Sequence, residues 1–184
     1  MKTVVLKFGG TSVGSIDRIK KVANIICSYK KKNTSVIVVS SAMSGSTNDL
    51  VKKTKELSDN FDPAEYDLLL SSGEQVACAL IAGRMKHLGY QARSWMSWQL
   101  PILTDGPYGA ARISKIDKNK ISKFINKGGI SIISGFQGVN QDNRITTLGR
   151  GGTDATAIML AKFFNASECI IYTDVDGVYT TDPR

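Results

Sequence analysis

The chain has 184 residues, 42% of them hydrophobic and 22% charged, which is typical of one packed globular domain. No apolar run approaches the roughly 18 residues of a membrane-spanning helix, and Lys7 interrupts residues 4–6 before a signal-peptide core could form, so we expect a cytoplasmic protein with no membrane partner. The formal net charge of +8 comes largely from lysines at 30–32, 52–55 and 115–127, on or near predicted helices and without interleaved aromatic residues, which argues against nucleic acid as a partner.

The first part of the chain alternates between strand and helix patterns. Residues 3–8 predict a strand that Gly9-Gly10 ends, and Ser15 can cap a helix with one apolar face, formed by Ile16, Ile19, Ala23 and Ile26. Residues 36–39 are a continuous β-branched run, which is typical of a strand buried on both faces in a parallel sheet.

Helical periodicity dominates the middle of the chain. It returns at residues 50–57 and again at 64–86, where Gly73 weakens the pattern without abolishing it. Residues 91–96 suit a short strand and residues 112–116 another, while the proline and glycine residues between 98 and 109 predict a loop.

The last third repeats the alternation. Asp117 can cap a helix that carries Ile121, Phe124 and Ile125 and ends at Gly128-Gly129. A buried strand at 130–134, a helix at 153–164 and a strand at 169–172 then follow. The three cysteines, Cys27, Cys78 and Cys169, are far apart and show no CxxC spacing, so we interpret them as small core residues and expect no metal site.

This alternation predicts an α/β layered fold with a mainly parallel sheet. In such folds ligands bind at the carboxyl ends of the strands. Polar and glycine residues follow the predicted strands directly, so we expect one edge of the sheet to gather Gly9-Gly10, Ser40-Ser41, Gly135, and Asp174 with Asp176-Gly177.

Residues 7–12 place Lys7 at a strand end before two glycines. Backbone N–H groups can therefore approach a phosphate closely, which predicts a short anion cradle. Taken alone, the motif would favour an ordinary β-turn beside a surface lysine over an anion site.

Residues 147–154 set Arg150 between glycines at the start of a helix. The first N–H groups of a helix point at an arriving anion, and an arginine side chain binds carboxylates in a bidentate fashion. The alternative interpretation, Gly151-Gly152 as a flexible link with Asp154 favouring the helix dipole, leaves Arg150 without a role. We therefore favour an anion site.

Residues 173–184 pack three aspartates and a glycine after a strand. A calcium loop of the EF-hand type is excluded because the terminal glutamate is missing. A loop at the edge of a nucleotide fits better, with Tyr179 available for stacking and Arg184 for phosphate.

Four motifs in fixed order, KFGGTS at the start, SSGE at 71–74, TTLGRGGTDATA at 146–157 and YTDVDGVYTTDPR at 172–184, resemble the aspartate kinases of the amino acid kinase superfamily. The resemblance spans residues 2–184 and corresponds to the N-terminal part of the catalytic domain. It implies a three-layer αβα sandwich and a single kinase domain over residues 1–184 that is incomplete at its C-terminus, without regulatory ACT domains. We also expect one uncovered sheet edge, low activity of the chain alone, and association through that edge or with a missing C-terminal part.

The resemblance also implies roles for particular residues. Lys7, Phe8, Gly9 and Gly10 would meet the ATP phosphates, and Asp154 would fix Lys7 in position. Aspartate would be bound by Thr47, Glu74, Arg150, Gly151, Gly152 and Thr153. The nucleotide would be held by Thr173, Asp174, Tyr179, Thr180, Thr181, Asp182, Pro183 and Arg184.

The implied reaction transfers phosphate from ATP, as co-substrate, to the side-chain carboxylate of L-aspartate. That carboxylate is already ionised near neutrality and needs no general base, and Mg²⁺ would enter bound mainly to phosphate oxygens and water. The product would be 4-phospho-L-aspartate, which leads to lysine, threonine and methionine. Two alternatives stay open: a kinase for glutamate, N-acetylglutamate, carbamate or a nucleoside monophosphate, and a silent nucleotide-binding module.

Overall fold

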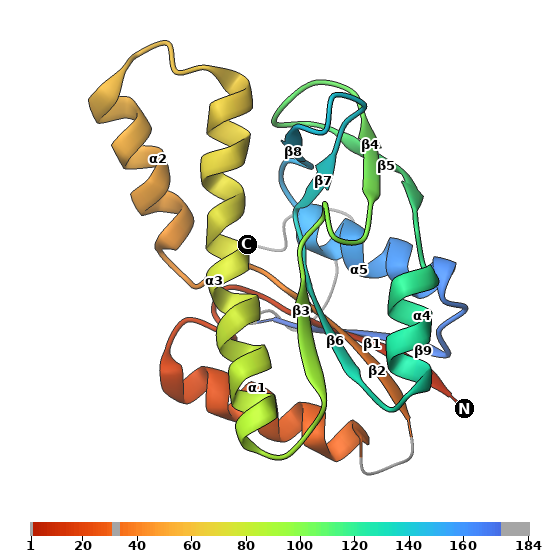
Figure 1. The fold of residues 1–184 in the computed structure, drawn as a ribbon. Coiled ribbons are helices and arrows are strands. Elements are labelled where there is room, and N and C mark those ends of the chain that lie inside the picture. Colours follow the sequence, from red (N-terminus) through yellow and green to blue (C-terminus); the bar gives the residue numbers. More distant parts are fainter. Residues whose placement is uncertain (1, 31–33, 174–184) are drawn as a thin grey trace, which may run out of the picture.

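The computed structural model describes residues 2–30 and 34–173 (Figure 1). A central five-stranded sheet is parallel at every pairing, and its strands run in the order β3 (Ala92–Trp95), β6 (Ile130–Ser134), β2 (Ser35–Ser40), β1 (Thr3–Phe8) and β9 (Glu168–Tyr172). Because the strands are parallel, their carboxyl ends all lie at one edge of the sheet.

Helices cover both faces of this sheet, which confirms the three-layer α/β architecture that the sequence predicts (Figure 1). One core contains residues of α1 (Ile16–Lys30) and α3 (Pro63–His87), and the other contains residues of α4 (Asn119–Asn126) and α5 (Gly152–Phe163). Successive strand residues alternate between the two: Val36 and Val38 enter the first core, Ile37 and Val39 the second. This two-sided burial explains the continuous β-branched run.

A second sheet lies above the carboxyl edge of the first (Figure 1). It has four strands in the order β5 (Arg112–Ile116), β4 (Ile102–Asp105), β7 (Gln137–Val139) and β8 (Ile145–Thr147). The prediction of a loop across residues 98–109 is therefore wrong for β4. That strand is defined by long-range pairing with β5 and β7, which local composition does not reveal.

Several local expectations also need correction. Ile16 is 54% exposed and lies off the buried face of α1, and α2 (Ser46–Leu57) begins four residues earlier than its periodicity predicts. The cap of α4 is Lys118, although the Asp117 Oδ1 atom still accepts a hydrogen bond of 2.9 Å from the N–H of Asn119. Of the cysteines only Cys78 is fully buried; Cys169 is exposed.

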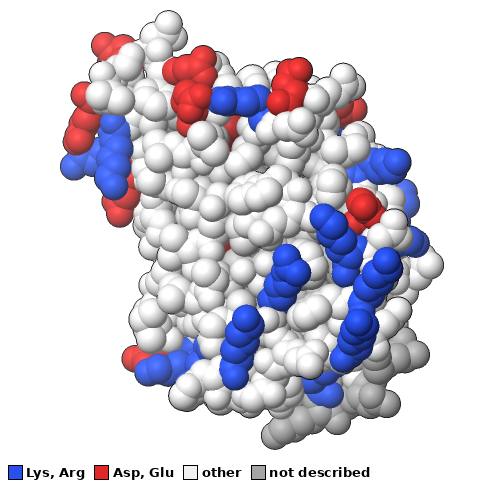
Figure 2. Space-filling view, viewed as in Figure 1, with Lys and Arg blue, Asp and Glu red and all other residues white. Residues whose placement is uncertain are grey.

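The surface charges agree with solvated helix faces. In Figure 2 the lysine and arginine side chains stand separately over this face, and the lysines in and around α4, namely Lys118, Lys120, Lys123 and Lys127, are exposed. None of the helices in the described ranges combines the length and apolarity needed to cross a bilayer.

Candidate active site

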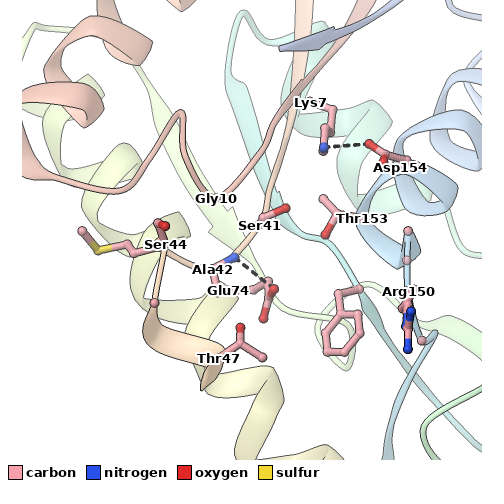
Figure 3. A pocket seen from close by; sticks show the side chains of 16 residues that line it. Lys7, Gly10, Ser41, Ala42, Ser44, Thr47, Glu74, Arg150, Thr153 and Asp154 are labelled. Carbon is pink, nitrogen blue, oxygen red and sulfur yellow. Dashed lines mark hydrogen bonds and ion pairs between the residues drawn. The ribbon is translucent and has the colours of Figure 1, made fainter. Parts of the chain in front are cut away.

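A cavity of about 360 Å³ opens at the carboxyl edge of the parallel sheet, where β1 and β2 end. It gathers residues from five separate parts of the chain (Figure 3): Lys7, Gly10, the loop Ser41–Gly45, Thr47, Glu74, Phe136 and the segment Gly149–Asp154. Of the residues expected to gather after β1, β2 and β6, Gly10 and Ser41 line this cavity, whereas Gly9, Ser40 and Gly135 do not. All eight residues predicted to act in catalysis or aspartate binding line this cavity: Lys7, Thr47, Glu74, Arg150, Gly151, Gly152, Thr153 and Asp154.

Lys7 is held at the end of β1 by an ion pair with α5. Its side chain points to the α5 face of the sheet, and its Nζ atom lies 2.7 Å from Oδ1 of Asp154 (Figure 3). Lys7 is only 7% exposed, whereas the Asp154 side chain is 41% exposed. A buried ammonium with one fixed carboxylate partner has a defined position, and it can be presented to an anion in the cavity.

Glu74 reaches the cavity from α3. Its Oε1 atom accepts a hydrogen bond of 3.0 Å from the N–H of Ala42, while Oε2 is buried without a hydrogen-bond partner among the described residues. Burial raises the pKa of Glu74 to about 7, and the Ala42 N–H opposes that rise. Gly73 is required here because a Cβ atom at that position would lie 2.8 Å from the Cβ of Ala42. The missing side chain lets α3 approach the loop after β2 closely enough for this contact.

The start of α5 forms the third wall. Gly151 is the N-cap residue with φ 72°, and no side chain caps the helix. The N–H of Gly152 donates to the carbonyl oxygen of Gly149 at 3.1 Å, and Thr153 and Asp154 in the first turn of α5 line the cavity. Thr153 is buried and Arg150 is exposed, and Arg150 forms no ion pair within the described residues. An exposed arginine beside an uncapped helix start is suited to a carboxylate or phosphate ligand.

The residues predicted to hold the nucleotide are only partly brought to this cavity. The Phe8 side chain is fully buried and stacks on Tyr172, with ring centroids 4.8 Å apart, so only the backbone of Phe8 could face a ligand. The N–H of Gly9 donates to the carbonyl oxygen of Tyr172 at 3.1 Å. Neither Gly9 nor the exposed Thr173 lines the cavity. Asp174 and residues 179–184 lie outside the described residues.

Two features of the cavity escaped the sequence analysis. Phe136 adopts φ 68°, a conformation that aromatic residues rarely occupy, and it is fixed there because its carbonyl oxygen accepts from the N–H of Leu148 at 2.9 Å. The loop Ser41–Gly45 closes the side opposite α5 and leads into α2. Ser41 and Gly135 directly follow buried strands, and this position was the sequence signal that these two loops lie near the site. No local sequence feature indicated the role of Phe136.

The donor set indicates anion chemistry. One buried cation and the start of a helix stand on one side, and one carboxylate stands on the other. Within residues 2–30 and 34–173 no three His, Cys, Asp or Glu side chains come close enough together to hold a metal ion by themselves. The arrangement can therefore receive a zwitterion and a phosphate, with any divalent ion arriving on the phosphate.

Comparison with known proteins agrees with this geometry. The sequence model of the amino acid kinase family matches residues 2–184. An aspartokinase of Geobacillus stearothermophilus is 50% identical over 184 residues, covering 100% of this chain and 45% of that protein. The chain therefore spans about half the length of the curated relatives it matches.

Solved structures give the same result. The aspartate kinase of Synechocystis superposes with a TM-score of 0.82 at 40% identity, over 98% of this chain and 30% of that one. Aspartokinase III of E. coli, in complex with aspartate and ADP, superposes with a TM-score of 0.84 at 29% identity, over 99% of this chain and 51% of that one. The chain therefore belongs to the amino acid kinase family, and the curated relatives that match it at about 48–50% identity include aspartokinases.

Proposed function

We propose that this protein phosphorylates the side-chain carboxylate of L-aspartate with ATP and releases 4-phospho-L-aspartate and ADP. The observation that carries the proposal is the opposition, across one cavity, of the Lys7–Asp154 pair and a buried carboxylate, Glu74. A zwitterionic substrate with an additional carboxylate can span the two.

Aspartate is bound by the groups around Arg150 and Glu74. The Arg150 side chain takes the α-carboxylate in a bidentate contact, with the segment Gly151–Thr153 lining the cavity beside it, and the unpartnered Oε2 of Glu74 takes the ammonium group. Thr47 lies in the same wall as Glu74 (Figure 3) and contributes a hydroxyl. The side-chain carboxylate of the substrate is then left to face Lys7.

The phosphate side of the reaction depends on charge. A carboxylate must approach a polyanionic triphosphate, so the catalytic task is to neutralise charge in a loose in-line transition state. Lys7 supplies the fixed cation, and Gly9 and Gly10 bring backbone close to the phosphates. Mg²⁺ accompanies ATP on its phosphate oxygens and water and supplies further positive charge when bound. No general base is needed, because the attacking carboxylate is already ionised.

The remaining nucleotide contacts come from the backbone of Phe8 and from Thr173, Asp174 and residues 179–184. The first relatives matched are all aspartokinases, and the structure of E. coli aspartokinase III holds aspartate and ADP. This supports the same ligands here. The cytoplasm is the expected location, and the product enters lysine, threonine and methionine synthesis. The expected partners are aspartate, ATP and further copies of the same chain.

Another kinase of the same fold is the alternative. Likeness to isopentenyl phosphate kinases, at 15% and 17% identity, shows the fold alone. The buried carboxylate of Glu74 favours aspartate, because it attracts an ammonium group and repels a second phosphate.

The test is ADP release by the purified protein with Mg²⁺ and ATP, measured in parallel with L-aspartate, L-glutamate, N-acetyl-L-glutamate, carbamate and UMP. Hydroxylamine traps the acyl phosphate as a hydroxamate and identifies the product. We expect release and trapping with L-aspartate only. Turnover with another acceptor would replace the proposal with that kinase, and nucleotide binding without ADP release would indicate a silent binding module.

A further inference from the structure

One face of α3 is polar although it is buried. Asp67, Ser71 and Glu74 follow one another at helical spacing, and all three are buried: Asp67 and Ser71 are 0% exposed and Glu74 is 4% exposed. Glu74 belongs to the cavity, but Asp67 lies two turns away and does not line it. A buried carboxylate outside the site needs a reason to be there.

Asp67 makes three hydrogen bonds, all to the second sheet and its turns. Its Oδ2 atom accepts from the N–H of Thr147 at 2.7 Å and from the N–H of Gly109 at 2.9 Å, and Oδ1 accepts from the hydroxyl of Thr147 at 2.8 Å. No lysine or arginine of the described ranges pairs with it. The carboxylate therefore joins α3 to two separate backbone segments.

Both segments lead directly to Arg150. Thr147 is the last residue of β8, three residues before Arg150, and its carbonyl oxygen accepts from the N–H of Ala111 at 3.0 Å. Gly149 packs against the Gly109 turn so closely that a Cβ atom on it would lie 2.9 Å from the Gly109 carbonyl oxygen. Holding Thr147 and Gly109 together thus fixes the backbone from which the Arg150 side chain extends.

We propose that Asp67 is a positioning residue for the amino-acid substrate: through Thr147 and Gly109 it sets the separation between Arg150 and Glu74. The proposal rests on the function proposed above, in which these two groups bind the α-carboxylate and the ammonium group of aspartate. Since Asp67 and Glu74 belong to the same rigid helix, the helix acts as the spacer. The phosphate side, Lys7 and Asp154, has no direct link to Asp67.

The hydrogen-bond directions suggest a decisive pair of variants. In Asp67→Asn the amide oxygen can take the place of Oδ2 and keep both backbone N–H bonds, while the amide nitrogen can donate to the Thr147 hydroxyl. Asp67→Ala removes all three bonds. Thr147→Val removes only the hydroxyl bond and leaves the backbone N–H bond in place, so it remains informative if Asp67→Ala does not fold.

The assay is steady-state ADP release with separate titrations of aspartate and ATP, alongside thermal unfolding. We expect Asp67→Ala to raise the KM for aspartate tenfold or more and Thr147→Val to raise it two- to fivefold, with the KM for ATP within twofold of wild type. Asp67→Asn should restore the KM for aspartate to within about threefold of wild type. Ser131→Ala is the matched control, since it removes another buried side-chain bond, from Trp95 Nε1 at 3.2 Å, away from the cavity.

A residue that served stability alone would lower the melting temperature in Asp67→Ala, as Ser131→Ala would, but would leave the KM for aspartate unchanged. That result in a folded Asp67→Ala or Thr147→Val variant overturns the proposal, and so does an equal rise in both KM values. Wild-type protein that turns over ATP with a different acceptor, or binds no aspartate, overturns the proposed function itself and with it the role of Asp67 toward aspartate.

Discussion

Replacing Glu74 with glutamine should make the stability of the ligand-free protein rise relative to wild type as the pH increases, while weakening its hold on aspartate. Burial raises the pKa of Glu74 from its ordinary value of 4.5 to about 7. Keeping the carboxylate ionised above pH 7 therefore costs the folded state on the order of 3 kcal/mol. The penalty is nearly absent below pH 4.5, where the carboxyl is neutral in both states; it grows between pH 4.5 and pH 7 and levels off above pH 7, where the carboxyl is ionised in both states.

Glutamine removes this dependence on pH. Its amide oxygen can still accept from the N–H of Ala42, but its amide nitrogen would occupy the position of the unpartnered Oε2, at a cost of about 1–3 kcal/mol. Between pH 5 and pH 8 the stability of Glu74→Gln should rise relative to wild type by roughly 2–3 kcal/mol. For a chain of this size that corresponds to about 5–10 °C in the difference between the two melting temperatures. Cys78, one turn along α3, does not interfere, because burial raises the pKa of its thiol far above this range.

The measurement is thermal unfolding by circular dichroism at pH 5, 6, 7 and 8 for both proteins, without ligand. Glu56→Gln is the control: Glu56 is exposed on α2, where its carboxylate lies 3.6 Å from Lys52 Nζ, and its removal should give a difference independent of pH. In the same variant of Glu74, loss of the ammonium partner should weaken aspartate binding by about 10- to 100-fold, with ATP little affected. A Glu74→Gln minus wild-type difference that stays constant from pH 5 to pH 8 would refute the reasoning about burial.

Three further predictions concern the rest of the cavity. Lys7→Ala should lower kcat by a factor of a hundred or more, since the loss of one electrostatic group in such a site costs on the order of 3 kcal/mol, while the circular dichroism spectrum stays that of a folded protein; comparable turnover would remove Lys7 from the mechanism. Arg150→Lys should raise the KM for aspartate at least tenfold although the charge is kept, because a lysine cannot make the bidentate contact; near-normal saturation by aspartate would show that Arg150 acts elsewhere. Removal of divalent metal with EDTA should abolish ADP release and Mg²⁺ or Mn²⁺ should restore it, whereas full activity in the chelator would exclude the proposed charge neutralisation.

Much of the fold can be predicted from the sequence because its signals are local. The β-branched run of β2, the apolar face of α1, and the Gly9-Gly10 pair that follows β1 each depend on a few neighbouring residues. The parallel arrangement follows from the alternation of such elements. The same holds for the functional edge, since residues directly after buried strands, Gly10 and Ser41 among them, do line the cavity.

The second sheet and the detailed site depend on the tertiary structure. Strands β7 and β8 have three residues each, and β4 has four, so they exist only through pairing with other strands, including the contact of β4 with β7 far along the chain, which composition cannot indicate. The positive φ of Phe136 likewise depends on the contacts around β6 and β8. The sequence shows an aspartate at 67 directly before three leucines, but only packing reveals that it is buried against Thr147 and Gly109. Local chemistry determines which elements form and which side chains are available, whereas the distances between those side chains are decided by long-range contacts that no short stretch of sequence contains.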